Sequence, residues 1–109
     1  MANLRAWIVD AAGDEEIESV VIGQMGWGEY KSESVPNYND IPKGRAMPWE
    51  EAMKWLDYEF DDGVGAPRCQ AVYAWTATKV IAIGQYDGST FWYTIPRNPT
   101  DIMPEMAGG

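Results

Sequence analysis

The sequence predicts an α+β fold, an antiparallel sheet of about five strands with one amphipathic helix packed on one face. Three observations lead to this prediction. Residues 48–63 carry the apolar period of a helix, several short segments are rich in β-branched and aromatic residues, and Asp87-Gly88 is typical of a tight hairpin turn. The expected order is ββαβββ, in a single domain over residues 1–109.

Residues 4–9 and 17–25 are expected to be the first two strands, joined as a hairpin. In the first segment, LRAWIV, the residues Leu4, Ala6 and Ile8 alternate with the others, which is the period of a strand. The second segment has VVI at its centre. The loop of this hairpin would present a first acidic cluster, which consists of Asp10, Asp14, Glu15, Glu16 and Glu18.

Residues 26–47 are expected to form a long irregular loop. They contain several glycines, prolines and asparagines and show no regular period. A loop of this length is uncommon in a small domain and is commonly functional or disordered. Its aromatic residues Trp27, Tyr30 and Tyr38 predict that it packs on the core or on a partner.

The helix is expected over 48–63, because Pro48 suits a first helical turn and Gly63 suits the position after a helix end. Its apolar stripe would be Trp49, Ala52, Met53, Leu56 and Phe60. Its solvent face would be Glu50, Glu51, Lys54, Tyr58, Asp61 and Asp62, with Trp55 at the margin. The acids at its end, Asp57, Glu59, Asp61 and Asp62, would oppose the helix dipole, which favours a role outside the fold over simple solvation.

Three further strands are expected at 69–75, 79–86 and 90–95, followed by an extended tail over 97–109. The Asp87-Gly88 turn sets the register of the last hairpin. It pairs Gly84 with Phe91, Ala82 with Tyr93 and Val80 with Ile95 on one face, and Ile83 with Trp92 and Ile81 with Thr94 on the other. Small residues opposite large ones predict that the first set lies under the helix, and that the second set is half exposed.

The net charge of −9 limits the classes of partner. Direct binding to nucleic acid or to acidic membranes needs clustered lysine and arginine and is disfavoured. A basic protein partner is favoured, because complementary potentials accelerate encounter. The alternative is that the charge only keeps a small protein soluble.

The chain contains no histidine, which removes histidine-based catalysis and the usual general base near neutral pH. Its one cysteine, Cys69, is expected to be a small buried hydrophobe, and a reducing cytoplasm is the default location. Asp57, Glu59 and Asp61 imitate the start of a calcium loop, but the twelfth position holds Arg68 instead of glutamate. We therefore expect no metal, no cofactor and no enzymatic activity.

The chain ends in Gly108-Gly109. A small acidic domain with strand-strand-helix-strand order and a terminal diglycine resembles the β-grasp family of ubiquitin-like modifiers and sulfur carriers. The resemblance implies that the diglycine carboxylate is adenylated and then conjugated or thiolated. Two features depart from the family: the long segment 26–47 separates the second strand from the helix, and the last strand forms a local hairpin instead of pairing with the first.

The sequence as a whole predicts a non-enzymatic protein-binding module, an inhibitor that docks on the basic surface of a nucleic-acid-handling protein. By analogy, this suits a phage anti-defence protein such as an anti-CRISPR, or an immunity protein against a nuclease, with mimicry of nucleic acid as its means. The predicted contact residues are Glu51, Trp55, Asp57, Tyr58, Asp61 and Asp62, with Asp14, Glu15, Glu16 and Glu18. The alternatives are a β-grasp carrier that acts through its diglycine, and a small-molecule binder that uses the aromatic loop or the face around Trp92. The side near Trp92 would also be available for a homodimer.

Overall fold

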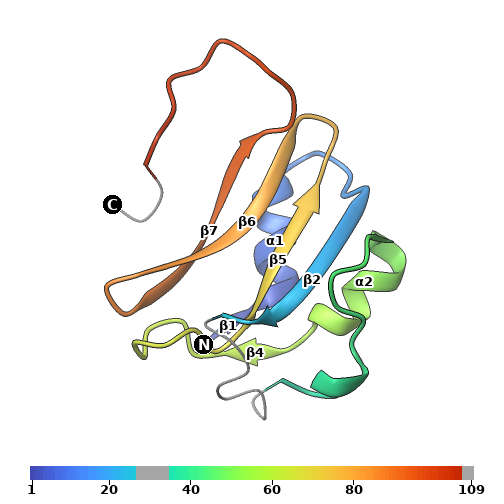
Figure 1. Cartoon of the computed structure of the whole chain (residues 1–109), viewed down its shortest axis with the longest axis vertical. Coiled ribbons are helices and arrows are strands. Elements are labelled where there is room, and N and C mark those ends of the chain that lie inside the picture. The colour runs from blue at the N-terminus through green and yellow to red at the C-terminus, as the bar shows by residue number, and fades with distance from the viewer. Residues whose placement is uncertain (27–34, 107–109) are drawn as a thin grey trace.

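The computed structural model describes residues 1–26 and 35–106 and has an α+β fold, so the predicted fold class is confirmed (Figure 1). Its main sheet is antiparallel and five-stranded, in the order β3-β2-β5-β6-β7. These strands are β2 Ser19–Met25, β3 Met47–Pro48, β5 Gln70–Trp75, β6 Lys79–Tyr86 and β7 Ser89–Pro96. A small second sheet pairs β1 Ala2–Asn3 with β4 Glu59–Phe60, and the helices of the described residues are α1 Leu4–Ala12, α2 Trp49–Leu56 and the 3-10 helix η2 Tyr38–Asp40.

The N-terminal segment is a helix, so the prediction of a strand over 4–9 and of a hairpin with 17–25 is wrong. The residues that α1 buries are spaced for a helix: Leu4, Ile8, Ala11 and Ala12. Asn3 begins the helix, since its side chain accepts a hydrogen bond from the backbone N–H of Ala6 at 3.0 Å. Gly13 ends it, with a positive φ of 63°. These two caps and the later alanines outweigh the β-propensity of the middle of the segment.

The second helix forms where it was expected but stops early. Ala52 and Leu56 are buried as predicted, and α2 ends at Leu56 instead of near Gly63. The next residues form β4, in which Phe60 pairs with Ala2 of β1. Pairing with the N-terminal strand therefore replaces the last helical turns.

The last hairpin has the predicted register, from Gly84 opposite Phe91 to Val80 opposite Ile95. Asp87 and Gly88 both have positive φ, 48° and 84°, as a two-residue hairpin turn requires.

The predicted faces of this hairpin are reversed. Ile81 is fully buried in the core, and Ile83 packs against the same core. The row Val20, Ala74 and Ile81 runs across three strands and lies wholly inside, so the neighbouring positions face the other way. The helices thus pack on Ile81 and Ile83 of the set that was expected to be half exposed, while Trp92 and Thr94 of the same set remain exposed.

The described part of the predicted loop packs on the core through four buried residues, Val35, Tyr38, Ile41 and Met47. Trp27 and Tyr30 lie outside the described residues. The tail residues 97–106 are exposed and form no helix or strand, and Gly108-Gly109 are not among the residues described. None of the helices in the described ranges is long and apolar enough to cross a membrane.

The strand order departs from the one that the β-grasp resemblance implies. In that family the last strand pairs with the first, whereas β7 lies at the edge of this sheet and pairs with β6. The connection through a local hairpin, expected from Asp87-Gly88, accounts for the difference.

Candidate protein-interaction surface

No helix of the described residues lies over one face of the main sheet (Figure 1). Figure 1 shows α1 behind β5, β6 and β7, while the near side of these strands is uncovered. Two rows of paired residues point to this side, Val21-Tyr73-Ala82-Tyr93 and Ser19-Trp75-Val80-Ile95, because they alternate with the buried row. We call this surface the open face. Its larger side chains are Val21, Tyr73, Trp75, Val80, Phe91, Tyr93 and Ile95, and none of the residues in these rows is charged.

The aromatic residues of the open face pack on one another. The rings of Tyr73 and Trp75 meet edge to face with their centroids 6.3 Å apart, and those of Phe91 and Tyr93 lie 5.9 Å apart. Tyr73 is nevertheless 57% exposed and Ile95 is 52% exposed. The other large side chains of the face are half-buried. Uncharged, aromatic and partly accessible surface of this kind is typical of the core of a protein interface.

The predicted acidic contact residues lie outside the rows of the open face, in one group after the C-terminus of α1 and a second group that includes Asp57 near its N-terminus. The group Asp14 to Glu18 follows the C-terminus of the helix. Asp57 lies near its N-terminus, where its Oδ1 accepts a hydrogen bond from the Asn3 amide at 3.1 Å. A helix of nine residues is about 13 Å long, so the two groups do not form one continuous patch.

Two acids of the first group have partners at the β5–β6 turn and just after β7. The carboxylate of Glu15 accepts hydrogen bonds from the backbone N–H and the hydroxyl of Thr78, at 3.2 and 2.6 Å. Hydrogen bonds from Thr76 and Thr78 hold the pKa of Glu15 below its usual value. Glu18 forms an ion pair with Arg97 at 2.6 Å. Asp14 and Glu16 are exposed.

The second group is tied to its neighbours in a similar way. Asp57 lies 3.8 Å from Arg5, and Glu51 forms an ion pair with Arg45 at 2.8 Å. Asp61 accepts a hydrogen bond from the backbone N–H of Gly63 at 3.0 Å. Asp62, half-buried, uses its backbone carbonyl to accept from the N–H of Thr90. These predicted contact residues are at the surface, but most of them already have intramolecular partners.

The expected solvent-facing position of Tyr58 is wrong. Because α2 ends at Leu56, the chain turns and places Tyr58 in the core, where it is 6% exposed. Its hydroxyl donates to Oε1 of Gln70 at 3.3 Å and accepts from the backbone N–H of Gln70 at 3.1 Å. Burial raises the pKa of Tyr58. Trp55 is half-buried and packs against the core. Neither Tyr58 nor Trp55 is therefore an exposed aromatic contact residue among the acids.

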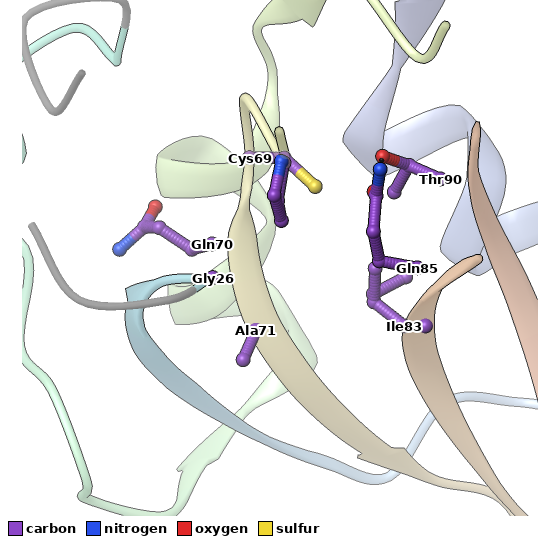
Figure 2. Close-up of a pocket in the computed structure, with 9 residues that line it drawn as sticks. Gly26, Cys69, Gln70, Ala71, Ile83, Gln85 and Thr90 are labelled. Carbon is purple, nitrogen blue, oxygen red and sulfur yellow. Dashed lines mark hydrogen bonds between the residues drawn. The ribbon is translucent and has the colours of Figure 1, made fainter. Parts of the chain in front are cut away.

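A cavity of about 180 Å³ lies between the separated ends of β5 and β6 (Figure 2). Cys69 lines it and is 1% exposed. Burial raises the pKa of the Cys69 thiol to about 12, so the thiol is neutral near pH 7 and a poor nucleophile. Within the described ranges, no group of three or more histidine, cysteine or acidic residues is arranged to hold a metal ion.

Sequence reasoning missed the open face although its signal was present. The predicted register already grouped Val80, Ala82, Tyr93 and Ile95 on one side of the hairpin. The pattern QAVYAW adds Tyr73 and Trp75 to that side by simple alternation. The error was to place a helix on this side.

Comparison of the chain with protein-family models, with curated proteins and with solved structures gave no match.

Proposed function

We propose that this chain is a non-enzymatic protein-binding module that docks on a basic partner protein through its open face. The observation that carries the proposal is the separation of two kinds of surface. The rows that form the open face carry no charge and include Tyr73, Trp75 and Tyr93, in a protein whose net charge is −9. Among the described residues, most charged side chains lie on the helices and loops, and Lys79 at the start of β6 belongs to the row that faces away from the open face.

The size of the open face fits a small interface. Strands lie about 4.8 Å apart, so the four longer strands β2, β5, β6 and β7 are together roughly 19 Å wide, and six residues of strand extend about 20 Å. The face therefore offers about 400 Å² to a partner, or about 800 Å² over both surfaces, which is the size of a weak or transient complex. Affinity then depends on a few well-packed aromatic contacts.

Charge favours a basic partner over a second copy of this chain. Two copies would each bring a net charge of −9 to the encounter and would repel one another. The exposed acids at both ends of α1, such as Asp14, Glu16 and Asp57, attract a basic surface and steer it during association.

Nucleic-acid-binding proteins are the class in which basic surfaces are most typical. We therefore propose that the module inhibits such a protein by binding next to its basic surface and blocking the access of nucleic acid, as a phage anti-defence or nuclease-immunity protein would. We place it in a reducing cytoplasm, because Cys69 is a buried free thiol.

The proposal is tested by capture from host lysate, with the full chain and a chain lacking Gly108-Gly109 as parallel baits. Retained proteins are eluted in a salt gradient and identified by mass spectrometry, with and without competing nucleic acid. We expect both baits to retain the same basic protein, which competing nucleic acid displaces. Covalent conjugates, or an adenylating enzyme captured by the full chain alone, would contradict the proposal and favour the diglycine carrier.

A further inference from the structure

The main sheet divides at one end. β5 and β6 pair only where residues 73–75 meet residues 80–82. Beyond this point β5 remains paired with β2 as far as Gln70, and β6 remains paired with β7 as far as Tyr86. The two pairs of strands separate, and the cavity of about 180 Å³ lies between them (Figure 2).

The walls of this cavity are largely apolar. Cys69 directs its thiol across the gap toward β6 and β7 (Figure 2). Ile83 and Pro67 are further apolar residues of the lining. The polar side chains in the lining are already bonded. Gln85 donates to the carbonyl of Gly65 at 2.6 Å and accepts from the hydroxyl of Thr90.

The third polar side chain in the lining, Gln70, is held on the far side of β5. Its amide nitrogen donates to the carbonyl of Gly23 at 2.9 Å, and its Oε1 accepts from Tyr58. Figure 2 shows this side chain pointing away from the gap. A neutral apolar group suits this lining, since a charged group would lose its hydration without gaining a charged partner.

The cavity reaches the open face. Ala71 and Gly84 both line it, and by strand alternation both belong to that face, where Ala71 is exposed. The ring of Phe91 covers Gly84, such that a Cβ at this position would lie 2.7 Å from Cζ of Phe91. Glycine therefore allows Phe91 to pack at the edge of the cavity without filling it.

We propose that this cavity is an anchor pocket for one neutral apolar side chain, of the size of phenylalanine or leucine, from the partner docked on the open face. This inference rests on the proposed function. An apolar cavity of about 150 Å³ admits benzene, so the volume here is enough for one phenyl ring. Interfaces draw most of their affinity from a few side chains buried in such pockets, and this pocket opens between the third and fourth strands of the five, at the end where the sheet divides.

The test uses two capped peptides, acetyl-Lys-Phe-Lys-amide and acetyl-Lys-Ala-Lys-amide, and benzene as a third probe. Dissociation constants are measured by NMR titration of the full chain. We expect the phenylalanine peptide to bind at least about tenfold more tightly than the alanine peptide, with shifts at Cys69, Ala71 and Ile83. Equal affinity of the two peptides, or no binding of either, overturns the proposal. Binding of benzene without a preference between the peptides would also overturn it and indicate a site for free small molecules.

Two variants connect the preference to the cavity. Cys69→Met fills the space from the buried wall, and Ala71→Phe covers the mouth from an exposed position that leaves the core unchanged. We expect either change to remove the preference for phenylalanine, while Val9→Met on the exposed side of α1 keeps it. A preference that survives in folded Ala71→Phe overturns the proposal.

The peptide experiment needs no partner, so its failure is distinguishable from failure of the proposed function. A chain that captures a basic partner through the open face, but shows no peptide preference, docks without this anchor.

Discussion

The hydroxyl of Tyr58 connects the segment after α2 to the buried start of β5. It donates to Gln70 Oε1 and accepts from the backbone N–H of the same residue, and Gln70 is fully buried. Tyr58→Phe leaves both groups of Gln70 without this partner. We expect the free energy of unfolding to fall by about 1–3 kcal/mol, measured by urea denaturation.

Tyr73→Phe is the matched control for this change. The same hydroxyl is removed from an exposed position on the open face, and we expect the stability to change by no more than about 0.5 kcal/mol. A loss in Tyr58→Phe no greater than the loss in the control would show that the buried pair with Gln70 does not stabilise the fold.

Cys69 makes the stability depend on pH in the alkaline range. Burial raises the pKa of its thiol from the ordinary value of 9.0 to about 12. Between these values the folded chain keeps a proton that the unfolded chain has lost. The free energy of unfolding therefore falls as the pH rises above about 9, by at most about 1.4 kcal/mol per pH unit.

Cys69→Val isolates this contribution, because valine is apolar and does not titrate. Urea denaturation of both proteins at pH 8 and pH 10 measures it. We expect the parent chain to lose about 1 kcal/mol more than the variant over this range. Tyr58 remains in both proteins, so its own titration cancels in the comparison. Equal losses would contradict burial of a neutral thiol in the folded chain.

At the scale of elements, α1 depends on the residue that caps its N-terminus. The side chain of Asn3 accepts from the N–H of Ala6, which would otherwise have no partner within the helix. We expect Asn3→Ala to lower the free energy of unfolding by about 1 kcal/mol, measured by chemical denaturation. Asn39→Ala, at an exposed position in η2, is the control and should change it by less than about 0.5 kcal/mol.

For the same helix, the pattern of residues 4–9 alone could not distinguish a helix from a strand. Leu4 and Ile8 fit both the alternation of a strand and the spacing of one helical turn, so six residues cannot separate the two. The signals that separate them lie at the ends, in Asn3 and Gly13 and in the buried Ala11 and Ala12. The last hairpin could be predicted to the residue because its turn is only two residues long.

At the scale of the whole molecule, the choice of covered face could not be read from the strands. β6 has a run of apolar residues, VIAI over 80–83, so both faces of this strand are apolar and hydrophobicity does not distinguish the buried face from the exposed one. Only the position of α1 shows that Ile81 lies inside and Val80 lies outside. The acidic clusters were visible in the sequence, but their distance from the open face depends on tertiary packing.

The acids and the open face should act on different steps of binding. Asp14→Lys with Glu16→Lys changes two exposed charges in the segment between α1 and β2, outside the rows of the open face. With the partner identified by capture, we expect this variant to associate several-fold more slowly and to dissociate at an almost unchanged rate, measured by surface plasmon resonance at low salt. A faster dissociation with unchanged association would place these acids inside the interface.

The central claim, that the open face is the contact surface, is tested most directly by one comparison of affinities for that partner. Tyr73→Asp introduces a charge on the open face, and Val9→Asp introduces the same charge at an exposed apolar position on α1. By isothermal titration calorimetry, we expect Tyr73→Asp to weaken binding at least about 30-fold, since it removes a contact worth 2 kcal/mol or more. Val9→Asp should change binding by less than about threefold. Equal affinities for the two folded variants would contradict the claim.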